Sequence, residues 1–272
     1  MKGDGRRPSP FAKSGKGRHG PSLFLFSDRS KQLYLPERRV YAVIVPKVRK
    51  SGKLSIWYEK ENSMDQYVIK RNELLAQKVI KGLASRNMTG YYAADKEEAL
   101  RIALSIIPEG SSVTMGGAMS AHEIGLVKAV QEGNYNFIDR NKAPDPRAAM
   151  LAGYDADFFL TSANAMTEDG VMVNIDGNSN RVSMIAQGPK KVLAIVGMNK
   201  ICDDIDGAMK RARNVAAPTN AQRFGLNTPC AKTGSCMNCK SPDTICCQFL
   251  ITRFSRHKDR IHVILVNDNL GF

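Results

Sequence analysis

The chain has 272 residues, of which 43% are hydrophobic and 24% charged, so it can bury a sizeable core and has the composition of a globular protein. Most of its net charge of +14 lies in residues 1–63, which hold 15 basic and 5 acidic residues, so the rest is only mildly basic and a nucleic-acid partner is not expected. No apolar run is long enough to span a membrane and no export signal opens the sequence, so we expect a cytoplasmic protein.

The first 63 residues differ in composition from the rest. They are rich in Gly, Pro, Ser and basic residues, which predicts a basic, disordered extension. The dipeptide Lys60-Glu61 can be encoded by AAGGAG, a ribosome-binding sequence, shortly before Met64. We therefore favour the hypothesis that translation starts at Met64 and that residues 1–63 are not native. A genuine disordered basic arm is the alternative.

From Met64 onward, amphipathic helices alternate with short apolar strands. Helices are predicted at 65–86, 95–107, 121–132, 146–152 and 203–215, and strands at 89–93, 113–115, 137–139, 157–161, 171–175, 191–197, 249–251 and 261–266. This alternation predicts one α/β domain over residues 64–272, with a mainly parallel sheet and helices on both faces. The loops that leave the carboxyl ends of parallel strands meet at the ligand crevice, which here points to residues 116–123 and 162–181.

The first of these loops lies in the sequence MGGAMSAHEIG, residues 115–125. Gly116 and Gly117 permit close approach of a ligand to the backbone, and the free N–H groups at a helix start favour an anion. Ser120 and Glu123 have the spacing of a capping box. We therefore predict that this loop holds an anionic group. An ordinary strand–helix turn, with Glu123 only a capping residue, is the alternative.

The second loop follows a buried strand with an unusual number of amides and carboxylates. Planar hydrogen-bonding groups at the carboxyl edge of a sheet suit a polar or anionic small ligand, and the candidates to orient it are Asn164, Glu168, Asp176, Asn180 and Arg181. Glu168 is the best candidate for acid–base or nucleophilic chemistry, and Arg181 for a carboxylate or phosphate clamp. The alternative is a β-hairpin loop, because Asp-Gly pairs favour tight turns.

These motifs carry a resemblance to a known family. The sequence TSANAMTEDGVMVNIDGNSNRVSMIAQGPKKVLAIVGMNKI, with MGGAMSAHEIG before it and VILVNDNLGF at the close, resembles the LUD domain of lactate-utilisation proteins. The resemblance covers residues 64–272. It implies a fold like that of CoA transferases, ribose-phosphate isomerases and formyltetrahydrofolate cyclo-ligase, and a role in oxidising lactate to pyruvate beside iron–sulfur partner proteins.

A weaker resemblance links the same region to methylthioribose-phosphate isomerase-like proteins, which carry an Asp where Asn164 stands. Because an amide cannot act as a general base, that isomerase mechanism is not expected here. Two other functions stay open beside lactate utilisation. One is a stand-alone acyl- or CoA-transferring or sugar-phosphate-isomerising enzyme of the same fold. The other is a non-catalytic, metal-stabilised subunit.

Five cysteines lie close together in residues 228–247. Cys230, Cys236, Cys239 and Cys246 form a C-x5-C-x2-C-x6-C pattern, and Cys247 is adjacent. Four thiolates suit tetrahedral zinc or an iron–sulfur cluster, and a reduced compartment favours metal over disulfides. We predict a metal held by Cys230, Cys236, Cys239 and one of Cys246 or Cys247, with Cys246 the first choice and with zinc or iron–sulfur undecided. Free cysteines in a loop, or a pair that oxidises, are the alternatives.

Overall fold

The computed structural model describes residues 47–48, 54–55 and 65–272. The chain divides between Ser63 and Met64 into two units. In the first unit, β1 (Lys47–Val48) and β2 (Leu54–Ser55) pair in antiparallel fashion. The predicted disorder of residues 1–63 falls almost wholly outside the described residues. Both that prediction and the predicted translation start at Met64 therefore stay predictions.

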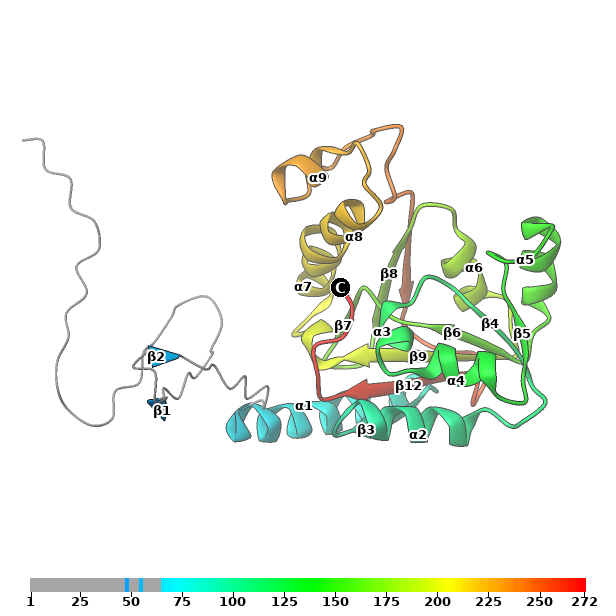
Figure 1. The fold of residues 1–272 in the computed structure, drawn as a ribbon, viewed down its shortest axis with the longest axis horizontal. Coiled ribbons are helices and arrows are strands. Elements are labelled where there is room, and N and C mark those ends of the chain that lie inside the picture. Colours follow the sequence, from blue (N-terminus) through cyan, green and yellow to red (C-terminus); the bar gives the residue numbers. More distant parts are fainter. Residues whose placement is uncertain (1–46, 49–53, 56–64) are drawn as a thin grey trace, which may run out of the picture. The chain divides into compact units, whose positions relative to one another are not determined.

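The second unit is built on a six-stranded sheet in which every pair of neighbouring strands is parallel (Figure 1). The strand order is β3-β12-β9-β6-β4-β5. The strands are β3 (Thr89–Ala93), β4 (Ser112–Met115), β5 (Asn136–Ile138), β6 (Phe158–Thr161), β9 (Lys191–Gly197) and β12 (Ile261–Val266). The predicted α/β class with a mainly parallel sheet is confirmed.

Helices cover both faces of this sheet, as the sequence predicts. Leu193 and Ile195 of β9 join a buried apolar cluster with α2 (Lys96–Ile106) and α4 (Leu126–Glu132). Val192, Ala194 and Val196 of the same strand point the other way and join a cluster with α1 (Gln66–Ser85) and α6 (Asn180–Ala186). Burial on both faces explains why these strands read as continuous apolar runs.

A second, four-stranded sheet has the order β10-β7-β8-β11. Strand β7 (Ala165–Thr167) turns back as an antiparallel hairpin into β8 (Met172–Asp176), which pairs with β11 (Gln248–Thr252), while β10 (Ile201–Cys202) lies parallel to β7. The hairpin that the Asp-Gly pair suggested is therefore present over residues 165–176. Helix α7 (Ile205–Arg211) packs on this sheet through Ala208 and, one residue beyond the helix, Ala212.

The remaining helices differ from the predicted ones in their caps, in their ends and in which of them were expected. The predicted capping box at Ser120 and Glu123 is wrong, because the N-cap of α3 (Met119–Glu123) is Ala118 and the Ser120 side chain points inward. Gly125, with φ of +77°, separates α3 from α4. The predicted helix at 203–215 continues through a π-turn (η2, Ala212–Ala216) into α8 (Ala217–Arg223). Helix α5 (Pro146–Tyr154) was predicted, whereas α6 and α9 (Pro229–Thr233) were not.

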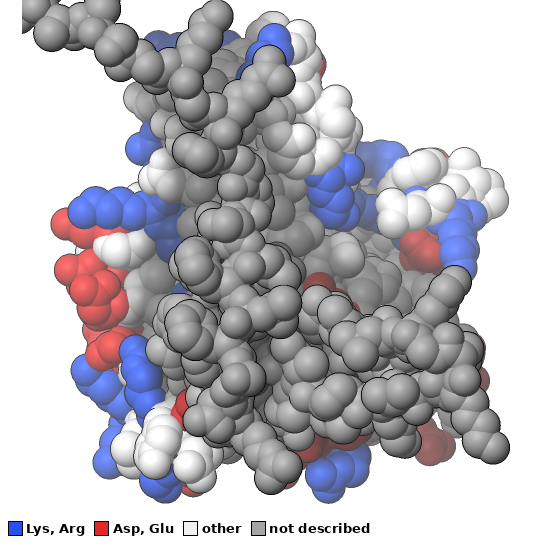
Figure 2. All heavy atoms as spheres, turned by 60° about the vertical axis from the view of Figure 1, so that its left-hand side comes forward, with Lys and Arg blue, Asp and Glu red and all other residues white. Residues whose placement is uncertain are grey.

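No helix in the described part of the chain is long and apolar enough to cross a membrane. Figure 2 shows acidic side chains beside basic ones on the described part of the surface in that view. This mixture agrees with the nearly balanced charge of residues 64–272.

Two glycines allow α1 to lie directly against the β7–β8 turn. A Cβ atom added to Gly82 would lie 2.8 Å from Asp169 Cα, and one added to Gly170 would lie 2.7 Å from the Leu83 nitrogen. Gly170 also has a φ of +89°, which side chains rarely adopt. Ion pairs of Lys78 with Glu168 and of Arg86 with Asp169 span the same contact.

We predict that Gly82→Ala lowers the free energy of unfolding by roughly 1–3 kcal/mol, because the methyl group overpacks this contact. Helix propensity alone would raise stability by about 1 kcal/mol, so the sign of the change is diagnostic. Urea unfolding measures it. The exposed neighbour Lys81 is the control, and Lys81→Ala should stay within about 0.5 kcal/mol of the parent. A Gly82→Ala protein at least as stable as the parent would show that the contact has room.

Candidate functional site

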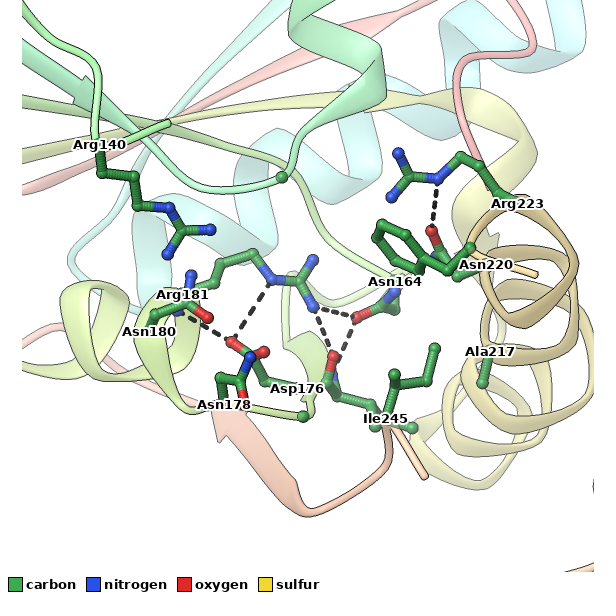
Figure 3. A pocket seen from close by; sticks show the side chains of 14 residues that line it. Arg140, Asn164, Asp176, Asn178, Asn180, Arg181, Ala217, Asn220, Arg223 and Ile245 are labelled. Carbon is green, nitrogen blue, oxygen red and sulfur yellow. Dashed lines mark hydrogen bonds and ion pairs between the residues drawn. The ribbon is translucent and has the colours of Figure 1, made fainter. Parts of the chain in front are cut away.

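A cavity of about 310 Å³ opens where the two sheets meet (Figure 3). Its walls come from the loop after β4, the loop after β5, the chain between β6 and β7, the end of β8 with the start of α6, α8, and the segment before β11. The loops at 116–123 and 162–181 therefore converge, as the parallel topology predicts. Of the predicted ligand-binding residues, those on the cavity wall are Gly117, Asn164, Asp176, Asn180 and Arg181.

Three arginines from different elements line this cavity. Arg140 follows β5, Arg181 lies in the first turn of α6, and Arg223 ends α8 (Figure 3). Among the described residues, Arg140 and Arg223 have no carboxylate within ion-pair distance. Sequence analysis predicted only Arg181, because single arginines in a loop and a helix carry no distinguishing pattern.

Arg181 is held rigidly at the base of the cavity. Its Nη2 donates to Asn164 Oδ1 at 3.0 Å and to the Ile175 carbonyl at 2.5 Å. Its Nε lies 4.0 Å from Asp176 Oδ2, and its side chain is 12% exposed. Burial lowers the pKa of Arg181 and the Asp176 charge opposes that effect. A guanidinium stays protonated under such shifts, so Arg181 is a fixed positive charge.

The acids and amides beside Arg181 serve the backbone as well as the cavity. Asp176 Oδ2 accepts from the N–H groups of Arg181 at 2.9 Å and Val182 at 3.1 Å, so this carboxylate caps α6. Asn164 Oδ1 accepts from the Ile175 N–H at 2.9 Å. The Asn180 amide is best oriented with its oxygen toward Arg140, where it accepts at 2.6 Å and 3.2 Å.

The glycine pair after β4 splits into two roles. A Cβ atom on Gly116 would lie 3.0 Å from both Phe159 Cζ and Arg181 Cγ, so Gly116 makes room for Arg181. A Cβ atom on Gly117 would have no heavy atom within 4 Å, and Gly117 borders the cavity. Glu123 accepts from the Gly271 N–H at 2.8 Å and does not line the cavity.

Glu168 does not reach this cavity. The β7–β8 hairpin carries it to α1, where it pairs with Lys78 and where its own N–H donates to the Cys202 carbonyl at 2.8 Å. The sequence placed it in the same loop as Asn164 and Arg181 because the short strand β7 was not recognised. Its position removes the geometric reason for assigning it acid–base or nucleophilic chemistry.

A buried lysine that the sequence did not single out lies at the inner end of the site. Lys200 closes the 3-10 turn after β9 (η1, Met198–Lys200) and is 2% exposed. Its Nζ lies 3.0 Å from Ser162 Oγ and 3.2 Å from Ser120 Oγ, and the two hydroxyls are 3.3 Å apart. Burial, with the Arg211 and Arg181 charges, lowers the pKa of Lys200 to about 7.

A cleft of about 30 Å³ joins this lysine to the larger cavity. Lys200 and Ser162 line the cleft, and both hollows share Gly117, Asn164, Arg181, Asn220 and Arg223. The closing residues of the chain cover the other side, since the Asn199 amide oxygen accepts from the Leu270 N–H at 3.2 Å and Phe272 borders the cleft. The lysine is thus shielded from bulk water and open toward the arginines.

The four predicted metal ligands line one further cavity of about 90 Å³, whereas Cys247 is exposed and lies outside it. All six cysteines are free thiols. Burial, and then the charges of Cys236, Cys230 and Cys239, raise the pKa of Cys246 to about 11. Within the described residues no group of three or more His, Cys, Asp or Glu side chains is already arranged as metal ligands. The thiols are therefore neighbours around one space without a formed coordination shell.

Comparison with known proteins identifies the family. The family model described as "LUD domain" matches residues 76–266. The chain belongs to the LUD domain family. This membership confirms the resemblance seen in the sequence and supports a lactate-utilisation-type role at the level of the family. No curated protein matches the sequence significantly.

One solved structure with a similar fold is a DUF162 family protein from Deinococcus radiodurans. It is 11% identical, the alignment covers 72% of this chain and 98% of that one, and the TM-score is 0.43.

We predict that Arg181→Lys lowers the free energy of unfolding by about 1.5–3 kcal/mol, because a lysine cannot make both hydrogen bonds of the guanidinium. Arg223→Gln should cost less than about 1 kcal/mol, since Arg223 is exposed and its contacts are a stack on Phe224 and surface hydrogen bonds to Asn220 and the Met119 sulfur. Denaturant unfolding of the two variants makes the comparison. Equal losses would contradict the division between a structural and a ligand-facing arginine.

Proposed function

We propose that this LUD domain binds a small organic anion in the arginine-lined cavity and acts in lactate utilisation beside iron–sulfur proteins. The observation that carries the proposal is the charge of the cavity. Arg140, Arg181 and Arg223 line it, and the carboxylate on its wall, Asp176, already caps a helix. A carboxylate such as that of lactate or pyruvate suits paired guanidinium donors.

The two outer arginines are suited to contact the ligand. Arg181 already donates two hydrogen bonds, to Asn164 and to the Ile175 carbonyl. Arg140 instead donates to the cavity-wall amide of Asn180. Arg223 donates to the cavity-wall amide of Asn220 and, at 3.8 Å, to the sulfur of Met119. Gly117 leaves the adjoining space open. We therefore assign ligand contact to Arg140 and Arg223, and orientation of the site to Arg181 and Asn164.

Binding of lactate and pyruvate to the full chain, measured by titration calorimetry, tests this proposal. Arg140→Gln and Arg223→Gln should each weaken binding about tenfold or more, since a hydrogen bond to a charged group contributes about 1.5–3 kcal/mol. Gly117→Val should also weaken binding while leaving the melting temperature unchanged, because its side chain fills the ligand space. The exposed Arg147, outside the cavity, supplies the control Arg147→Gln. Equal affinities in all four variants would refute the anion site.

We also propose that Cys230, Cys236, Cys239 and Cys246 hold a metal, as zinc or an iron–sulfur cluster. Four sulfur donors around one cavity have the right chemistry for either group, and a bound cation would favour their thiolate forms. Bound metal would order the segment between α8 and β11, which apart from α9 forms no helix or strand. Ile245 and Ala217 border both this cavity and the arginine-lined one, so the metal would also support the ligand site.

The neighbouring pair Cys246 and Cys247 gives a matched test of this metal site. After anaerobic purification, elemental analysis should find zinc or iron in stoichiometric amount in the parent and in Cys247→Ser. Cys246→Ser should lose most of the metal and melt at a lower temperature, because binding energy becomes folding energy. Brown colour would indicate iron–sulfur, and a colourless zinc protein would indicate a structural site. A metal-free parent with freely reactive thiols would contradict the proposal.

A further inference from the structure

The triangle of Ser120, Ser162 and Lys200 has features that anion binding alone does not require. All three side chains are buried, with exposures of 0%, 5% and 2%. They come from three separate segments, after β4, after β6 and after β9, at the carboxyl ends of neighbouring strands. Among the described residues Lys200 has no carboxylate within ion-pair distance. Its hydrogen bonds go to the two hydroxyls.

The charges around Lys200 favour its neutral form. Arg211 of α7 and Arg181 of α6 face it with the same sign, while Glu123 of α3 partly offsets them. Together with burial they lower the pKa of Lys200 to about 7, so a substantial fraction of the amine is unprotonated near neutral pH. A neutral amine at 3.0 Å from a serine oxygen can accept the hydroxyl proton instead of donating to it.

The two serines differ in their access to a ligand. Ser162 borders the cleft that leads to the arginine-lined cavity, whereas Ser120 does not. The backbone of Ser162 is fixed, because its carbonyl accepts from Asn174 Nδ2 at 2.9 Å and the next strand is tied in by Asn164. Ser120 instead contacts both Lys200 and Ser162 from behind. This arrangement suits Ser162 as a reacting group and Ser120 as a positioning residue.

We propose that Ser162 is the nucleophile of an acyl-transfer site, with Lys200 as its general base, and that the substrate is a small, activated acyl compound carrying a negative charge. The class includes acyl phosphates, esters and thioesters. The inference rests on the proposed function in one respect only, since the arginine-lined cavity would hold the negative charge of the donor. The nearby amine and hydroxyls supply chemistry that a binding site does not need.

The proposed step balances without a further reagent. As Ser162 Oγ forms a bond to the acyl carbon, its proton passes to the neutral Lys200 amine and the carbonyl π electrons move to oxygen. Collapse of this intermediate breaks the bond to the leaving oxygen or sulfur. The proton held on Lys200 passes to that leaving group, and the product is an ester at Ser162. Water or a second acceptor then takes the acyl group by the reverse sequence.

Acetyl phosphate is a suitable probe, because it is small, anionic and an acyl donor. The full chain is incubated with it and the peptides are analysed by mass spectrometry. We expect one acetyl group on the Ser162 peptide, removable by hydroxylamine as an ester is. Exposed Lys210 reports uncatalysed amide acetylation in the same sample. Ser162→Ala should abolish the ester, and Ser162→Cys should restore labelling as a thioester. The exposed serine of α2 supplies the control Ser105→Ala.

The rate of ester formation separates the roles of Lys200 and Ser120. Lys200→Met should slow it by about 10²–10⁴-fold, the usual contribution of a general base. Lys200→Arg should slow ester formation similarly, since a guanidinium does not deprotonate. Because this variant keeps the positive charge, it serves as the test if the protein does not fold with Met at this position. The parent rate should rise as pH rises through about 7, because the neutral amine is the active form. Ser120→Ala should slow the reaction less and keep the pH profile.

Three outcomes would overturn the inference. They are a stable amide on Lys200 in place of the ester, no label on Ser162 in the parent, and an unchanged rate in both Lys200 variants. Its failure is distinct from failure of the anion site. If lactate and pyruvate bind but Ser162 is never acylated, the acyl-transfer inference fails and the proposed function stands. If Ser162 is acylated equally fast in Arg140→Gln, the inference stands and the arginine-lined cavity loses its role.

Discussion

The architecture of the site depends on how the chain leaves one sheet and enters another. After β6 ends at Thr161, the backbone crosses from the parallel sheet to β7 in three residues, and of its polar groups the Asn164 N–H joins the second sheet by donating to the Val173 carbonyl while others need side-chain partners. Side-chain amides supply these partners. Asn174 donates to the Ser162 carbonyl, and Asn164 accepts from the Ile175 N–H. The amides that crowd this stretch of sequence are thus first a solution to buried backbone polarity.

This crossing also decides which side chains can meet. Because β4, β6 and β9 are parallel neighbours, the segments that follow them emerge at one edge. Ser120 after β4, Ser162 after β6 and Lys200 after β9 therefore lie within hydrogen-bonding distance of one another, although they are far apart in sequence. The hairpin beyond the crossing then returns with Asp176, whose cap on α6 aims Arg181 back into the same space. One short segment thus joins the charged cavity to the buried amine.

Sequence analysis recovered the parallel sheet because its strands are apolar runs buried on both faces, as at 191–197 and 261–266. It recovered the convergence of the two loops from topology alone. It failed where one pattern has two structural meanings. Serine and glutamate three residues apart indicate a helix cap, yet Ser120 turns inward to Lys200. Glu168 shares a polar loop with Arg181, but a three-residue strand carries it to α1. A single lysine after an apolar strand gives no sign that it is 2% exposed.

The place of β12 in the sheet has a consequence for how the protein is made. This strand lies between β3 and β9, although it follows β3 by more than half the domain. Until residues 261–266 leave the ribosome, both neighbours have an unpaired edge, and Tyr91, Ile195 and other apolar side chains lack their partners. The nascent domain therefore cannot close progressively from its amino end. The sheet is completed only when β12 inserts between β3 and β9, so these two pairings have to wait for a segment far along the chain.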